Sequence, residues 1–95
     1  MSVGDELLAS LAVLRAAYPT GLPDGDYLPL LAVLHDGYSE RQLAALVAEF
    51  TGRERVVVDN DHARAVSSHR PDGQQVASVR ARLEEAGYGA LPQDG

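Results

Sequence analysis

Leucine and valine recur along this chain at spacings of three and four residues, in short runs that proline and glycine interrupt. In the first run, Leu7, Leu11 and Leu14 are spaced four and three residues apart, which places them on one face of a helix. Every run is shorter than the ~20 apolar residues that a membrane-spanning helix needs. The pattern therefore predicts short amphipathic helices that bury their apolar faces against one another, with no membrane span.

Turn residues and helix caps set the expected bounds of these helices. Pro19 and Gly21 are expected to form a corner after the first helix, and the Asp26 carboxylate is expected to cap the second. Pro29 would then lie in the first turn, where a missing amide costs little. We predict a single all-α domain over residues 1–95, a compact bundle of five short helices at 5–18, 27–36, 40–51, 60–68 and 73–86.

Two pairs of residues have the spacing of a capping box. Ser39 and Gln42 lie three positions apart, so each side chain can accept a hydrogen bond from the backbone amide of the other residue. Gly52 is expected to end this third helix in the left-handed conformation. Asp72 and Gln75 show a similar spacing before the last helix. The sequence thus predicts local start signals for the third and the last helix.

The β-branched run of Val56, Val57 and Val58 is typical of a strand, yet no partner strand is predicted elsewhere in the chain. An isolated strand cannot satisfy its own backbone. We therefore expect an extended connector that places the valines in the core, with pairing across a dimer as the alternative. The fourth helix would start after it, capped by Asp59 or Asn60.

The familiar signatures of catalysis and metal binding are missing from the sequence. The absence of cysteine excludes disulfides, thiolate zinc sites and thiol nucleophiles, and no nucleophile elbow, phosphate-binding glycine loop or His-Glu-x-x-His motif occurs. His62 and His69 are seven positions apart, which is not a metal-ligand spacing. We expect no enzyme activity, no cofactor and no metal, and we expect His35, His62 and His69 to face solvent or cap helices.

The start of the chain lacks the cationic segment of a secretory signal, because Asp5 and Glu6 precede its first apolar run. Together with the lack of cysteine, this start predicts a cytoplasmic protein.

The charged residues bear on the kind of partner that the chain could bind. The formal net charge is −6, which opposes contact with a phosphate backbone. Arg64, Arg70, Arg80 and Arg82 nevertheless lie on or beside the last two predicted helices, and they form a candidate face for an anionic partner. We expect a non-catalytic protein-interaction module that is monomeric, with a dimer as the alternative state. Binding of nucleic acid through these arginines is the alternative function.

Two consecutive motifs carry a family resemblance. Tyr18-Pro19-Thr20-Gly21 is followed by Asp26-Tyr27-Leu28-Pro29-Leu30, and this tandem resembles domain-of-unknown-function family 3349. The resemblance covers nearly the whole chain and continues through the capped helix at Ser39 to the helix entry at Pro71-Asp72.

The resemblance implies a five-helix bundle of largely actinobacterial distribution, and it implies no activity, substrate or catalytic residue. Its motif residues are expected to have structural roles, and Tyr18 and Tyr27 are expected to anchor the chain on either side of the corner. Relatives tend to end in a Gly-Trp-Pro-like sequence, whereas this chain continues from Gly87-Tyr88 into a glycine- and proline-containing tail. We expect residues 88–95 to be partly frayed.

Overall fold

Five α-helices follow one another in the computed structural model, which describes residues 5–88. The described residues contain no strand, so the predicted all-α fold with five helices is confirmed. No helix in this part of the chain is both long enough and apolar enough to cross a membrane. The helices are α1 Asp5–Ala17, α2 Asp24–His35, α3 Glu40–Thr51, α4 Arg55–Val66 and α5 Gly73–Glu85.

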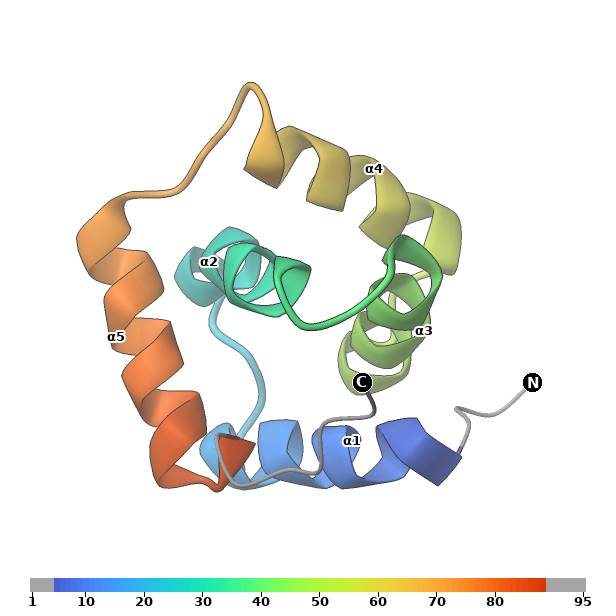
Figure 1. The fold of residues 1–95 in the computed structure, drawn as a ribbon, viewed down its shortest axis with the longest axis vertical. Coiled ribbons are helices and arrows are strands. Elements are labelled where there is room, and N and C mark those ends of the chain that lie inside the picture. The colour runs from blue at the N-terminus through green and yellow to red at the C-terminus, as the bar shows by residue number, and fades with distance from the viewer. Residues whose placement is uncertain (1–4, 89–95) are drawn as a thin grey trace.

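Helix α2 lies near the centre of the fold, with the other helices around it (Figure 1). It packs against α3, α4 and α5, while α1 packs against α3 and α5. The sequence predicted a single apolar face on α2, but Pro29 and Val33 are buried as well as Leu30 and Leu34. A helix that is apolar around most of its circumference is typical of an interior position.

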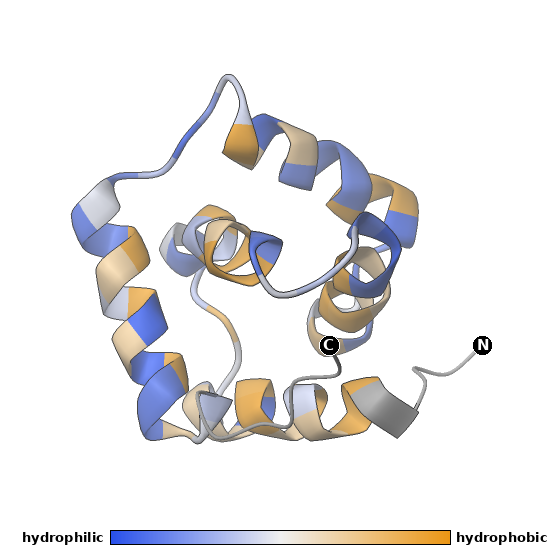
Figure 2. Cartoon of the chain, viewed as in Figure 1, coloured by the Kyte–Doolittle hydropathy of each residue, from blue (hydrophilic) through white to orange (hydrophobic). Residues whose placement is uncertain are grey.

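The main hydrophobic core draws on all five helices. Tyr18 and Phe50 meet at its edge, with their ring centroids 6.3 Å apart. Polar residues are most frequent on α4 and α5 (Figure 2), which leaves α1, α2 and α3 to supply most of the buried surface. The largest fully buried side chains are Leu14, Leu30, Leu31, Leu34, Leu43, Leu46, Leu83, Val33, Val47, Val58 and Val79.

The predicted corner between α1 and α2 is present. Helix α1 ends at Ala17, one residue before the predicted end, and the Gly21 amide donates to the Tyr18 carbonyl at 3.0 Å. Gly21 has a φ of 103°, a conformation that glycine adopts without steric cost.

Helix α2 begins three residues earlier than predicted, and the expected Asp26 cap is wrong. The N-cap is Pro23, which provides no side-chain hydrogen bond, and Asp26 lies inside the first turn. Pro29 therefore occupies the sixth helical position rather than the third. A proline there removes the amide that would bond to the carbonyl four residues earlier, which is that of Gly25.

Helix α3 matches its predicted bounds at both ends. The Gln42 amide donates to Ser39 Oγ and the Ser39 amide donates to Gln42 Oε1, each at 3.1 Å. Gly52 ends the helix in the left-handed conformation with a φ of 78°, and its amide donates to the Ala48 carbonyl. The capping box and the glycine stop are thus confirmed.

Helix α4 begins at Arg55, five residues before its predicted start. The run from Val56 to Val58 is helical, so neither the extended connector nor a strand that pairs across a dimer describes it. Only Val58 of the three is buried. The N-cap is Glu54, and Asp59 and Asn60 lie within the helix instead of capping it.

Helix α5 starts at Gly73 as predicted and ends at Glu85, one residue before its expected end. The predicted tail over residues 88–95 lies outside the described residues, except for the half-buried Tyr88.

Candidate functional site

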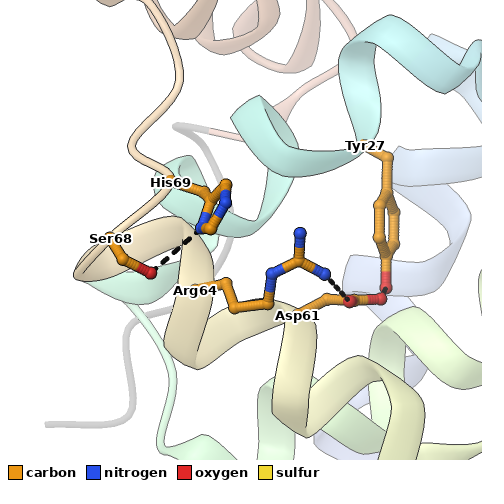
Figure 3. Close-up of polar contacts among 5 residues, drawn as sticks. All are labelled: Tyr27, Asp61, Arg64, Ser68 and His69. Carbon is orange, nitrogen blue, oxygen red and sulfur yellow. Dashed lines mark hydrogen bonds and ion pairs between the residues drawn. The ribbon is translucent and has the colours of Figure 1, made fainter.

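Tyr27 connects α2 to α4 through a hydrogen bond to Asp61 (Figure 3). Its hydroxyl donates to Asp61 Oδ2 at 2.7 Å, and Asp61 Oδ1 lies 3.5 Å from Arg64 Nη1. The Arg53 guanidinium lies over the Tyr27 ring, 4.2 Å from its centroid, in a cation–π arrangement. Burial and the bond to Asp61 raise the pKa of the Tyr27 hydroxyl well above its ordinary value. The phenol therefore stays protonated near neutral pH and serves as a donor, not as a base.

Tyr18 has a similar environment on the other side of the corner. Its hydroxyl donates to Asp26 Oδ2 at 3.0 Å, and the Arg82 guanidinium lies 4.7 Å from the ring centroid. Burial, together with the bond to Asp26, raises the pKa of Tyr18 to about 12. Both tyrosines of the tandem motif thus anchor the chain, as the motif implies, and each does so through a carboxylate and an arginine.

The predicted capping box between Asp72 and Gln75 is wrong. Asp72 is the N-cap of α5 but makes no side-chain capping bond. Gln75 instead reaches across to α2, where its Nε2 donates to the Gly25 carbonyl at 3.0 Å and lies 3.4 Å from Asp26 Oδ1. This is the carbonyl that loses its helical partner because of Pro29. Sequence reasoning could not find this role, since the two residues are 50 positions apart.

Two histidines that the sequence did not connect lie in contact. His35, at the end of α2, and His62, in the middle of α4, join through Nδ1 and Nε2 at 2.9 Å. His62 is only 4% exposed, which corrects the expected solvent-facing or capping role. Burial, followed by the proximity of His35, lowers the pKa of His62 below its ordinary value. His62 is therefore a neutral partner for His35 near neutral pH.

The third histidine is separate from this pair. His69 is exposed and contacts only its neighbour Ser68 among the residues drawn in Figure 3, at 3.0 Å. Among the side chains described, those of residues 7–88, no group of three has an arrangement that could hold a metal ion.

The four arginines of the predicted anionic-partner face are distributed along two elements and the loop between them. Arg64 pairs with Asp61 on α4, and Arg70, in the loop, donates through Nε to the Val66 carbonyl at 3.3 Å. Arg80 and Arg82 lie on the second half of α5, and Arg82 covers the Tyr18 ring. At 1.5 Å per residue, the start of α5 and Arg82 are roughly 14 Å apart along the helix axis. Arg80 and Arg82 therefore lie well along α5 from the loop that carries Arg70.

The solvent-facing side of α4 is partly apolar. Val56 is 61% exposed and Val57 is 40% exposed, although both are large hydrophobic residues. They recur with other exposed residues at spacings of three and four, so they share one side of the helix. We call this set the outward face of α4, and it consists of Val56, Val57, Asn60, Ala63 and Arg64.

A comparison with protein families identifies the family of this chain. The model of a family described as protein of unknown function (DUF3349) matches residues 6–91, a range that includes both tyrosine anchors, the histidine pair and the outward face of α4. No curated protein and no solved structure matches the chain.

Proposed function

The chain belongs to the DUF3349 family of proteins of unknown function, and on that premise we propose that it is a non-catalytic protein-interaction module of the cytoplasm. The outward face of α4 binds the partner. The lack of cysteine supports a reducing compartment, where thiols stay unpaired and disulfide scaffolds are rare.

The exposure of Val56 and Val57 carries this proposal. Val58, the next residue, is fully buried, so it packs in the core while the other two valines remain accessible to a partner. Adjacent exposed hydrophobic side chains on an ordered helix are a feature of surfaces that bind other proteins. Their positions on a helix also favour a partner that packs along the helix axis.

The charge next to the valines indicates the chemistry of the partner. Arg64 lies on the same face, and its side chain is 54% exposed even though it pairs with Asp61. Arg53 lies beside the start of the helix, held over the Tyr27 ring. A partner segment with apolar side chains and at least one carboxylate complements this arrangement. The face comprises few residues compared with the ~20–30 on each side of a standard interface, so the interaction is transient.

The arginine contacts favour a protein partner over nucleic acid. Arg82 already covers the Tyr18 ring, which leaves fewer free guanidinium groups for phosphates. The net charge of −6 repels a polyanion at long range.

Site-specific photocross-linking tests the proposal. A photoreactive benzoylphenylalanine replaces Asn60, at the centre of the outward face, and the matched control carries it at the exposed Ala12 of α1. In native lysate we expect position 60 to cross-link to a different protein, at a segment in which apolar residues flank a carboxylate. Adding Val57→Asp should abolish this product without altering the circular dichroism spectrum, because Val57 is exposed.

Three results would contradict the proposal. They are cross-linking of position 60 to a second copy of the chain, cross-linking to nucleic acid, and equal products from positions 60 and 12.

A further inference from the structure

A second surface feature, distinct from the outward face of α4, is a pocket between α2, α4 and α5. The loop that joins α4 to α5 contributes Arg70 and Pro71 to its lining, and the pocket has a volume of about 250 Å³. Its wall is largely apolar and includes Ala32, Val66 and Val76. The volume is below the ~300–1,000 Å³ of pockets that hold drug-sized ligands, so its occupant must be small.

Two side chains with nitrogen donors also line this pocket. His35 comes from the last turn of α2 and Arg70 from the loop, and both are exposed. None of the described lining residues is acidic. A largely apolar wall with one imidazole and one guanidinium has the polarity of a site for an anion with an apolar part.

The contacts of these two side chains leave donors available to a ligand. The Nδ1 atom of His35 is engaged with Nε2 of the buried His62, which leaves Nε2 as the second nitrogen of the His35 ring. His62 is neutral because burial lowers its pKa, and in the tautomer in which His62 Nε2 donates to His35 Nδ1, the Nε2–H of the His35 ring remains a donor for a ligand. Arg70 uses Nε for the Val66 carbonyl, which leaves the two terminal nitrogens of its guanidinium group.

We propose that this pocket binds a small monocarboxylate with a short apolar tail. The carboxylate accepts hydrogen bonds from His35 and Arg70, and the tail packs against Ala32, Val66 and Val76. A volume of about 250 Å³ corresponds to about eight water molecules at ~30 Å³ each. Hexanoate, with about eight non-hydrogen atoms, matches this size.

Titration with hexanoate, followed in amide NMR spectra of the intact chain, tests the site. We expect saturable shifts that centre on Ala32, Val66 and Val76. Hexanamide, which has the same tail but no charge, should bind about tenfold more weakly, because hydrogen bonds to charged groups contribute more than neutral ones.

Matched variants locate the carboxylate contacts. His35→Gln and Arg70→Gln should each weaken hexanoate binding by about tenfold. His69→Gln and Arg15→Gln remove the same side-chain types outside the pocket, and they should leave the affinity unchanged. Preserved dispersion of the amide signals shows that each variant is folded.

Several outcomes would overturn the assignment. Equal affinity for hexanamide would reduce the pocket to an uncharged apolar depression, and equal affinity for acetate or inorganic phosphate would leave a site for anions without a tail. Tighter binding of acetyl-Gly-Val than of hexanoate would assign the pocket to peptide C-termini. Unchanged affinity in the double variant of His35 and Arg70 would place the carboxylate elsewhere.

Discussion

Tyr18 and Tyr27 show how much of a residue's structural role can be predicted from a local sequence motif. The motif implied that both tyrosines anchor the chain, and both do so with buried rings. The hydrogen-bond partner of Tyr27 could not be predicted from the motif, because Asp61 is 34 residues away in the sequence. The partner of Tyr18 is Asp26, only eight residues away. A residue type and its burial can be predicted locally, but a hydrogen-bond partner on another helix depends on how the helices pack.

The His35–His62 pair had no local signal in the sequence for the same reason. Each histidine has an ordinary helical context, and a separation of 27 positions matches no ligand or pairing motif. The position of His62 did contain one clue, since Val58 and Ala65, four residues before and three residues after it, are also buried. That stripe becomes visible only when α4 is known to begin at Arg55.

The buried His62 should make the stability of the protein depend on pH. Its pKa is lower in the folded chain than the ~6.5 of an unfolded histidine, so the unfolded state binds more protons as the pH falls through ~6.5. Stability is therefore highest above this pH and is lost below it. The neighbouring His35 strengthens this effect, whereas Glu40 and Asp59 oppose it.

Urea unfolding followed by circular dichroism, at about pH 7.5 and about pH 5.5, measures the dependence. We expect the loss of unfolding free energy on acidification to be smaller in His62→Gln than in the unmodified chain. The exposed His69→Gln should behave like the unmodified chain. An unchanged loss in His62→Gln would show that His62 does not contribute to the pH dependence.

Among the helices, the predicted boundaries were accurate where the end signal lies within a few residues of the helix end. The Ser39–Gln42 box and Gly52 fix both ends of α3, and all three residues act on their own neighbours. Helices α2 and α4 begin after Pro23 and Glu54 without a side-chain cap. These starts therefore carry no local capping signal, and the helix that buries Val58 forms despite the β-propensity of the valine run.

Helix α2 contains an interior proline whose backbone cost is offset by another helix. Pro29 leaves the Gly25 carbonyl without its i+4 donor, and Gln75 of α5 supplies one at 3.0 Å. This pairing couples the start of α5 to the first turns of α2. It also explains why Gln75 does not complete a capping box with Asp72.

A double-mutant cycle tests this coupling. Gln75→Ala should reduce the free energy of unfolding by about 0.5–1.5 kcal/mol. In the Pro29→Ala background, Gln75→Ala should reduce the free energy of unfolding by less, because the restored amide at position 29 can bond to the Gly25 carbonyl. Urea unfolding of the four proteins gives the interaction energy. Gln74→Ala, at the exposed neighbouring position, serves as the control, and additive effects would refute the coupling.

For the whole molecule, the fold class followed from periodicity, whereas the arrangement of the helices did not. The sequence predicted five amphipathic helices without indicating which of them lies in the middle. The uninterrupted apolar run from Tyr27 to Leu34 was the available signal, because a helix that is apolar on all sides is a buried one. The central place of α2 (Figure 1) makes its side chains part of the packing of three other helices.

Truncation of Leu30 should therefore weaken the whole fold, not α2 alone. Leu30 is fully buried, so Leu30→Ala removes apolar contacts and leaves a cavity, with an expected loss of about 2–5 kcal/mol. The exposed Leu8 is the matched control, and Leu8→Ala should change stability by less than about 0.5 kcal/mol. Because α2 contacts α3, α4 and α5, far-ultraviolet circular dichroism and tyrosine fluorescence should report one coincident transition for Leu30→Ala. Two separate transitions would mean that α2 does not hold these helices together as a single cooperative unit.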